Sequence, residues 1–251
     1  GNYGTNLKTT NGDLNWGSQV STTIENLKSI SFLNANTGFI TGGFNTWLVL
    51  KTTNGGVTWA QSIINSGGSP YGIHFIDVNT GFVCGSVGVL MQTTNGGANW
   101  DMLSVGGIVN LYGICFSSAL TGYIAGSAGD VYKTTNGGAN WSTQTTGLAS
   151  SLNSIYFFDN NNGFAAGFQG KIVKTTNAGA NWTILTSGMT QSINKIYALD
   201  LQNVHAVADN SRYLFTTNGG TNWTVNILAE ANSNSLKSIC FLDVNKGIIT
   251  G

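Results

Sequence analysis

A motif of the form Thr-x-Asn-x-Gly-x-x-Trp recurs six times along the chain. The copies begin at Thr9, Thr52, Thr93, Thr134, Thr175 and Thr216, so the steps are 43 residues and then 41 residues four times. A period in the low forties fits four short strands with their turns, which is the blade of a β-propeller. The repeat therefore predicts an all-β chain.

Residues 28–63 serve as the model blade. Ile30 and Phe32 alternate with polar residues, as on a half-buried strand. Asn54-Gly55 is a tight-hairpin signal that supplies residues of positive φ, and Trp59 can cover the turn. The expected strands are 29–33, 39–42, 47–53 and 57–63.

The phase of the repeat at the two termini predicts how the ring closes. The last first-strand segment, 238–251, has no hairpin after it, and the hairpin at 9–16 has no first strand before it. One blade shared by both termini would close a six-bladed ring of four-stranded antiparallel blades and remove exposed strand edges. We thus expect one domain, 1–251, with blades at about 28–63, 71–104, 112–145, 153–186, 194–228, and 237–251 plus 1–20.

The composition excludes several classes of partner. Charged residues make up 8% of the chain, and ten Lys+Arg balance ten Asp+Glu, so no net field attracts nucleic acid or an anionic membrane. No apolar run is long enough for membrane insertion, and no signal-peptide pattern opens the chain. The first residue is Gly1, which suggests a segment of a larger protein. We expect a monomeric domain of a secreted bacterial protein, extracellular or at the cell surface, whose export signal lies outside this chain.

Cysteine and histidine give no metal or cofactor signal. Cys84, Cys115 and Cys240 lie in apolar, strand-like stretches and are expected to be buried free thiols. His74 and His205 show no metal-ligand spacing with cysteine or acidic neighbours. We therefore expect neither a metal ion nor a cofactor.

The box resembles the Asp-box, or BNR repeat, with Asn in place of the usual Asp. The fuller unit, Ile-x-Phe through Asn-x-x-Gly-Phe to Lys-Thr-Thr-Asn-Gly-Gly-x-x-Trp, is similar to repeats of the photosystem II assembly and stability factor family and of secreted bacterial proteins. This resemblance implies a propeller with the box on the hairpin between the third and fourth strands. Two departures, Asp13 in the first box and Val204-His205 in place of Gly-Phe, resemble drift. The family's arginine-rich face cannot be built with Arg212 as the only arginine, which argues against a photosynthetic role.

Enzymatic alternatives find little support. Sialidases share this ring and box, but their resemblance implies an arginine triad, which one arginine excludes. Other glycoside hydrolases need two carboxyl groups about 5–10 Å apart. Glu25 and Glu230 are the pair that could meet, and a glycoside hydrolase stays an alternative. We predict no catalytic residue, because the other recurrent acids are expected to form turns: Asp77, Asp159, Asp200 and Asp243.

A binding site is expected where the repeat is broken. The residues that enter the first strands mix cations, aromatic rings and amides, which suits a glycan or a protein surface: Lys28, Tyr71, Tyr112, Asn153, Asn194 and Lys237. Trp47 stands where other copies have Gly or Ser, and it either offers a stacking platform or packs over its own blade. Arg212 is a further candidate. The sequence thus favours a non-enzymatic recognition or scaffold module, with an assembly factor for a membrane protein complex as another alternative.

Overall fold

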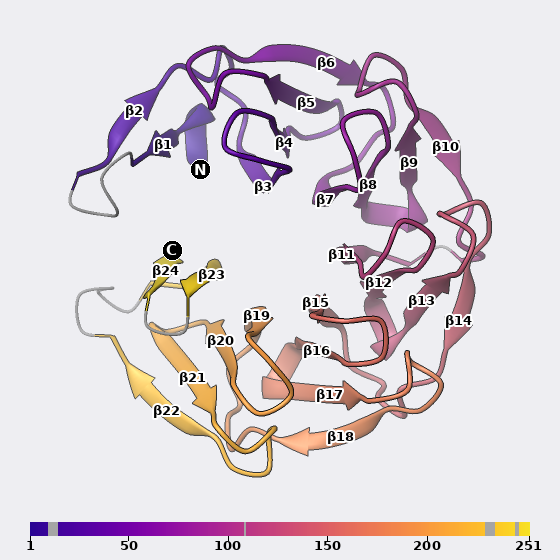
Figure 1. Ribbon diagram of the computed structural model, residues 1–251, viewed down its shortest axis with the longest axis vertical. Coiled ribbons are helices and arrows are strands. Elements are labelled where there is room, and N and C mark those ends of the chain that lie inside the picture. Colours follow the sequence, from indigo (N-terminus) through magenta and orange to yellow (C-terminus); the bar gives the residue numbers. More distant parts are fainter. Residues whose placement is uncertain (10–14, 108, 229–233, 244–245) are drawn as a thin grey trace. The chain divides into compact units, whose positions relative to one another are not determined.

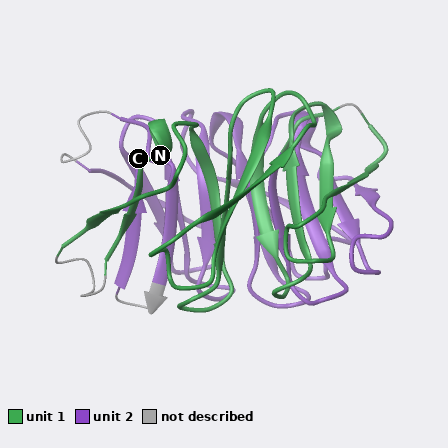
Figure 2. Ribbon diagram, turned by 90° about the horizontal axis from the view of Figure 1, so that it is seen from above, with its two compact units in different colours: residues 1–111 green, residues 112–251 purple. Residues whose placement is uncertain are grey.

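The computed structural model describes residues 1–9, 15–107, 109–228, 234–243 and 246–251. The chain falls into two compact units, Gly1–Leu111 and Tyr112–Gly251, which Figure 2 colours separately. The described residues form five four-stranded and two two-stranded sheets, all built from antiparallel neighbours, together with four short 3-10 turns. Asp13, Glu230 and the middle of the first box lie outside the described residues.

Unit 1 contains one two-stranded and two four-stranded sheets, which follow one another along the chain (Figure 1). The strands of the two-stranded sheet are β1 (Asn6–Lys8) and β2 (Gly17–Gln19). The first four-stranded sheet contains β3 (Leu27–Phe32), β4 (Gly38–Gly42), β5 (Trp47–Thr52) and β6 (Ala60–Ile64). The second contains β7 (Pro70–Phe75), β8 (Gly81–Gly85), β9 (Leu90–Thr93) and β10 (Asp101–Leu103).

Unit 2 contains three four-stranded sheets and ends in a two-stranded sheet. The first sheet has β11 (Leu111–Phe116), which begins one residue before the unit, β12 (Gly122–Gly126), β13 (Val131–Thr134) and β14 (Ser142–Gln144). The second has β15 (Leu152–Phe157), β16 (Gly163–Gly167), β17 (Lys171–Thr175) and β18 (Thr183–Thr186). The third has β19 (Ile193–Ala198), β20 (Val204–Ala208), β21 (Arg212–Thr216) and β22 (Thr224–Ile227), and the last pair is β23 (Ser238–Asp243) and β24 (Lys246–Thr250).

The N-terminal residues have the phase that the repeat predicts. The 3-10 turn η1 (Asn2–Gly4) has φ values of 51° at Tyr3 and 72° at Gly4. The turn η2 (Ser86–Gly88), between the second and third strands of a complete sheet, has 54° at Val87 and 75° at Gly88. The two remaining 3-10 turns, η3 (Ser127–Gly129) and η4 (Phe168–Gly170), have the same pattern. The strand β1 therefore takes the place of a third strand, and the joining of the two terminal sheets into one blade stays a prediction of the repeat.

Side-chain hydrogen bonds of the box stabilise its hairpin. The Oγ1 atom of Thr52 accepts hydrogen bonds from the backbone N–H of Gly56 at 2.8 Å and of Asn54 at 3.3 Å. The Oδ1 atom of Asn54 in turn accepts the N–H of Thr58 at 2.9 Å. The positive φ values lie at Gly55 (67°) and Gly56 (89°), so the expectation that Asn54 has a positive φ was wrong. Asn54 acts through its side chain instead, and the same threonine and asparagine contacts recur in the four later copies.

Aromatic rings connect the box hairpin to its own sheet and connect neighbouring sheets to each other. Trp59 is 6% exposed and meets Phe32 of the first strand edge-on, with ring centroids 6.3 Å apart. Between neighbouring sheets of one unit, Phe39 stacks on Phe75 at 3.4 Å, and Tyr123 stacks on Phe157 at 3.7 Å. Such pairs stabilise beyond the area that they bury. The predicted role of the box tryptophan as a lid over the turn is confirmed for Trp59.

A lysine at the end of the third strand ties one sheet to the next. Lys51 donates from Nζ to the Gly96 carbonyl oxygen at 3.0 Å and lies 5.5 Å from the centroid of the Phe39 ring. Comparable contacts within the units are Lys8 to Gly55 at 2.7 Å, Lys133 to Ala178 at 2.7 Å and Lys174 to Gly219 at 3.1 Å. A charged donor on a turn carbonyl makes a strong hydrogen bond. These lysines therefore hold neighbouring sheets together.

Candidate functional site

Trp47 is fully buried, so its indole offers no exposed face for a ligand. The side chain is 0% exposed, and Nε1 donates to the Gly67 carbonyl oxygen at 2.9 Å. It belongs to a cluster with Ile64 and Ile73, and its ring edge lies against Gly85, where an added Cβ would come within 2.5 Å of it. The expectation of a stacking platform is corrected in this structure, because the neighbouring sheet covers the ring.

Four of the six residues that enter the first strands are β-bulge residues. In the sheet register, Leu27 pairs with Gly42 and Ser29 with Thr41, which leaves Lys28 as the extra residue. The same shift places an extra residue in three further first strands: Tyr71 in β7, Asn153 in β15 and Asn194 in β19. A bulge bends its strand and re-aims one side chain, and bulges concentrate beside binding and active sites. The fold thus presents one variable side chain at the same point of each of these sheets.

In unit 1 the two bulge residues belong to neighbouring first strands. Ser29 and Ser31 of β3 accept the backbone N–H groups of Ile73 and Phe75 of β7 at 3.4 Å and 3.3 Å. Lys28 is exposed and Tyr71 is half-buried. A cation and an aromatic ring therefore lie at the same end of two adjacent strands.

In unit 2, Asn153 and Asn194 reach the surface and also make hydrogen bonds to the next part of the chain. Asn153 donates from Nδ2 to the Ile193 carbonyl oxygen at 2.9 Å, and Asn194 donates to the Leu236 carbonyl oxygen at 2.9 Å. Asn194 also donates to Asp209 Oδ1 at 2.9 Å. Both amides are half-buried and bridge consecutive first strands, which sequence reasoning did not predict.

The other candidates of unit 2 differ in exposure. Tyr112 is half-buried at the start of β11, and Lys237 is exposed just before β23. Arg212 is half-buried at the start of β21, where its Nε atom is buried and has no hydrogen-bond partner among the described residues. The structure brings Lys28 with Tyr71 and Asn153 with Asn194 onto neighbouring first strands. Tyr71 and Tyr112 belong to different units, and each is described within its own.

Asp209 is the acidic group that contacts the bulge residue Asn194 in unit 2. Burial acts to raise the pKa of this carboxyl, but hydrogen bonds from Asn194 and Ser235 and the charge of Lys237 hold it below its usual value. The Ser235 hydroxyl donates to Oδ1 at 2.7 Å. Asp209 is therefore an ionised acceptor at neutral pH and is not a general acid.

The recurrent aspartates cap turns, as expected. The Oδ1 atom of Asp77 accepts the N–H groups of Asn79 and Thr80 at 2.7 Å and 2.8 Å. Asp159 and Asp200 make equivalent pairs of bonds in their own turns. Asn34 does the same in the first sheet at 2.9 Å for both bonds, so the function needs only a side-chain oxygen. The side chain of Asp243 lies outside the described part of the structure, so its expected function in a turn stays a prediction.

These turns predict how stability depends on pH. The pKa values of Asp77, Asp159 and Asp200 are lowered by hydrogen bonds to the carboxylate, against the opposing effect of burial. A lowered folded-state pKa gives stability that is present above the unfolded value near 3.9 and is lost as the pH falls through the folded value. We expect urea midpoints to fall below about pH 4. The triple variant Asp77→Asn, Asp159→Asn, Asp200→Asn should keep the turn bonds and flatten this acid limb, and an unchanged limb would contradict the assignment.

Among the described residues no group of His, Cys, Asp and Glu has the geometry of a metal site. His205 Nδ1 lies 2.8 Å from the Tyr213 hydroxyl, and burial lowers the pKa of His205, partly opposed by Asp200. His74 is half-buried on β7. Both histidines thus belong to the packed sheets.

The cysteines are free thiols, and two of the three are buried as expected. Cys115 Sγ accepts the backbone N–H of Phe157 at 3.4 Å, and burial raises its pKa to about 11. Cys84 is also buried, but Cys240 is exposed, so the expectation for Cys240 was wrong. Cys240 lies on β23, the last first strand of unit 2, and no later first strand of that unit covers it.

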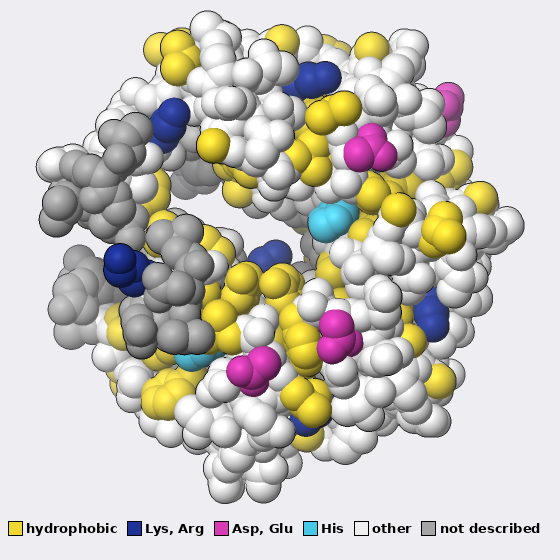
Figure 3. All heavy atoms as spheres, in the orientation of Figure 1, with side chains coloured by type: hydrophobic (Ala, Val, Ile, Leu, Met, Phe, Trp, Pro, Cys, Tyr) yellow, Lys and Arg dark blue, Asp and Glu magenta, His cyan; other side chains and the backbone are white. Residues whose placement is uncertain are grey.

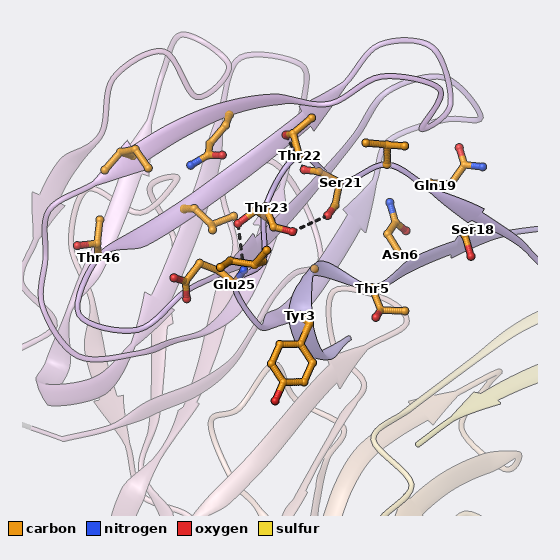
Figure 4. A pocket seen from close by; sticks show the side chains of 16 residues that line it. Tyr3, Thr5, Asn6, Ser18, Gln19, Ser21, Thr22, Thr23, Glu25 and Thr46 are labelled. Carbon is orange, nitrogen blue, oxygen red and sulfur yellow. Dashed lines mark hydrogen bonds between the residues drawn. The ribbon is translucent and has the colours of Figure 1, made fainter.

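A pocket of about 820 Å³ lies within unit 1, beside the two-stranded sheet (Figure 4). Most of the described side chains that line it carry a hydroxyl or an amide group, and the apolar ones are Val20, Ile24, Leu48 and Ile63. Among the described residues that line it, Glu25 is the only charged one. Because Glu230 lies outside the described residues, the predicted pairing of Glu25 with Glu230 stays a prediction.

Charge is sparse over the visible surface. Figure 3 shows single acidic and basic side chains separated by polar and apolar atoms. None of the helices in the described residues is long and apolar enough to cross a bilayer. Recognition by this surface would therefore depend on shape and hydrogen bonds more than on a strong field.

The four-stranded antiparallel sheets, each with its box hairpin, define a β-propeller of the BNR-repeat type. A family model described as photosynthesis system II assembly factor YCF48 matches residues 8–107 and 104–240. The chain belongs to this family. The all-β propeller fold and the family resemblance predicted from the repeat are thereby confirmed, despite the single arginine.

Solved structures agree on the fold. A structure of YCF48 bound to D1 peptide is 20% identical, with a TM-score of 0.78, over 99% of this chain and 84% of that one. YCF48 from Cyanidioschyzon merolae is 17% identical, with a TM-score of 0.76, over 99% and 86%. The GH74 enzyme of Niastella koreensis is 18% identical, with a TM-score of 0.68, and covers 81% of this chain but 38% of the enzyme. A comparison with curated proteins gives no match.

The family corrects the predicted location. A family of photosystem II assembly factors is not one of secreted surface proteins. The expectation of an extracellular or cell-surface protein was therefore wrong. The expected origin in a bacterium stays a prediction.

Proposed function

We propose that the chain is a non-enzymatic assembly factor that binds a segment of another protein. The family match over most of the chain carries this proposal. YCF48 has been solved with a D1 peptide bound, so this fold can hold a peptide. A propeller fold alone would not suffice, because the same architecture hosts unrelated activities.

The bulge residues supply the binding surface in this proposal. Each bulge presents one side chain that varies from sheet to sheet while the surrounding strands repeat. The bulge residues Lys28 and Tyr71 of unit 1 offer a cation and an aromatic ring. Tyr112 and Lys237 enter first strands of unit 2 and offer the same two kinds of side chain. Tyrosine provides a large contact area at low entropy cost, and lysine pairs with acidic residues or carbonyl groups. The preferred ligand would be a peptide with apolar and acidic side chains.

Catalysis is not proposed. Asp77, Asp159 and Asp200 already accept backbone N–H groups in their turns, and the described residues that line the pocket of unit 1 include one carboxylate, Glu25. Glycoside hydrolysis requires two carboxyl groups about 5–10 Å apart. The GH74 relatives support the fold alone, since this chain spans less than half of their length.

The proposal predicts that a tyrosine at a bulge dominates peptide affinity. Fluorescence anisotropy would measure binding of labelled D1 peptides and of scrambled versions to the whole chain. We expect Tyr71→Ala to weaken binding about 30-fold, because truncation of an aromatic hot spot costs about 2 kcal/mol. Leu120→Ala is the control, since Leu120 is 60% exposed in the turn after β11.

Two results would reject the proposal. Equal affinity for D1 and scrambled peptides would show that no specific segment is recognised. A Tyr71→Ala protein that binds as tightly as the Leu120→Ala control would remove the bulge of β7 from the binding surface.

A further inference from the structure

The pocket of unit 1 lies where the chain lacks an apolar residue that every other repeat supplies. Five or seven residues after each of the other box tryptophans stands a large apolar side chain: Ile64, Val105, Leu148, Met189 and Leu228. Ile64 and Val105 are 3% and 4% exposed, and the other three pack against the core clusters. After Trp16 both positions are polar, namely Ser21 and Thr23, and both line the pocket. The space that an apolar residue closes elsewhere is therefore open here.

Asn6 is a second departure at the same pocket. It is the middle residue of Thr5-Asn6-Leu7. Its counterparts in four of the five complete third strands are apolar and 0–1% exposed, namely Val49, Leu90, Val131 and Ile172, and the fifth counterpart is the half-buried Tyr213. The Nδ2 atom of Asn6 is buried and has no hydrogen-bond partner among the described residues. A buried donor without a partner is costly, and such a group needs an explanation. A ligand in the pocket would provide one.

Backbone strain is the third departure. Thr22 has a φ of 61° at the position where two other repeats have Gly147 at 79° and Gly188 at 73°. For a β-branched residue this conformation is a true outlier, and such strain gathers at binding and active sites. Thr22 also lines the pocket, and its Oγ1 donates to the Ser21 carbonyl oxygen at 2.6 Å. Three independent departures from the repeat thus converge on one wall.

The chemistry of the pocket selects a neutral ligand that is rich in hydroxyl groups. Figure 4 shows threonine and serine hydroxyls and the Asn6 and Gln19 amides among the side chains that line the pocket, and no described lining residue is a lysine or an arginine. A phosphate or a carboxylate ligand would have no cation to pair with. Side-chain amides and hydroxyls can donate and accept at the same time, as sugar hydroxyls do, and Leu48 and Ile63 can contact the apolar face of a pyranose ring. The volume of about 820 Å³ accommodates a small oligosaccharide.

We propose that this pocket binds a neutral saccharide of one to three rings. The site lies wholly within unit 1 and does not include the bulge residues Lys28 and Tyr71. It is therefore a second binding function, separate from the proposed capture of a protein segment.

The test uses the full chain and a panel of neutral mono-, di- and trisaccharides, measured by saturation-transfer NMR and by isothermal titration calorimetry. We expect saturable binding of at least one member of the panel. Thr23→Leu should weaken that binding at least about tenfold, because leucine would close the space with the apolar side chain that Leu148 places at the equivalent position of one repeat in unit 2. It should also raise the Tm by about 2–4 °C through the closed space. Thr186→Leu is the matched control on an exposed position of β18.

Asn6→Leu provides an independent variant. It removes the unpartnered donor, so we expect a fold that is at least as stable and a saccharide affinity that is lower at least about tenfold. Absence of binding by every saccharide in the panel, or unchanged affinity in Thr23→Leu, would overturn the proposal. The Thr23→Leu protein should bind the peptide with unchanged affinity. Loss of saccharide binding and loss of peptide binding can therefore be distinguished.

Discussion

Replacing Trp47 with alanine is expected to lower the free energy of unfolding by about 3–5 kcal/mol, the range found for buried tryptophan and phenylalanine. The side chain is 0% exposed and fills the space between β5 and the neighbouring sheet. The substitution would leave a large cavity beside Gly85 and remove the 2.9 Å hydrogen bond to the Gly67 carbonyl oxygen. Urea denaturation followed by circular dichroism would measure the change.

Phe44→Ala is the control, because Phe44 lies three residues earlier and is 67% exposed. An exposed substitution away from special features is expected to change stability by no more than about 0.5 kcal/mol. Should Trp47→Ala prevent folding, Trp47→Phe keeps most of the volume and tests the lost hydrogen bond alone. A Trp47→Ala protein of native stability would show that the indole is not part of the core.

The fold was readable from the sequence because the same local interactions recur in each repeat. The threonine and asparagine of the box lock one hairpin, and Trp59 packs edge-on against Phe32 of the same blade. Such local contacts leave a sequence signature at a fixed period. The positive φ values were placed one residue too early, since Asn54 acts through its side-chain oxygen and leaves the left-handed backbone to Gly55 and Gly56.

Contacts between sheets were harder to predict. The sequence left open whether Trp47, which replaces a glycine, is an exposed platform or a packed side chain. Its ring packs against Ile73 and Gly85 of the next sheet, and Nε1 bonds to the Gly67 carbonyl oxygen. Asn153 and Asn194 were chosen as ligand-binding amides, and their Nδ2 atoms bond to the following first strand. Asn153 and Asn194 are bulge residues because the register shifts there. Such a shift depends on how the strands pair, which the repeat alone does not specify.

The pocket had a sequence signal that the repeat pattern concealed. Ser21 and Thr23 are ordinary polar residues when read alone. They become informative only when each is compared with the apolar residue that other copies place at one of these two positions, such as Ile64 or Met189. The lysine before the box threonine also recurs in the sequence. Its contact with the next sheet, however, could be recognised only in the structure.

Replacing Lys51 with methionine is expected to lower the free energy of unfolding by about 2–3 kcal/mol. Methionine keeps the length of the side chain and removes the charge that donates to the Gly96 carbonyl oxygen at 3.0 Å. Hydrogen bonds to charged groups contribute about 1.5–3 kcal/mol, and the ammonium over the Phe39 ring adds about 0.5–1 kcal/mol at a partly exposed site. Thermal and urea unfolding would measure the loss.

Lys246→Met is the control, because Lys246 is exposed on β24. Lys174→Met gives a second comparison. Burial lowers the pKa of Lys174, so the cost of removing water from its ammonium offsets part of the bond to Gly219. We therefore expect a smaller loss for Lys174→Met than for Lys51→Met. Equal stability of the Lys51→Met and Lys246→Met proteins would show that the lysine contacts follow from sheet packing and do not hold the sheets together.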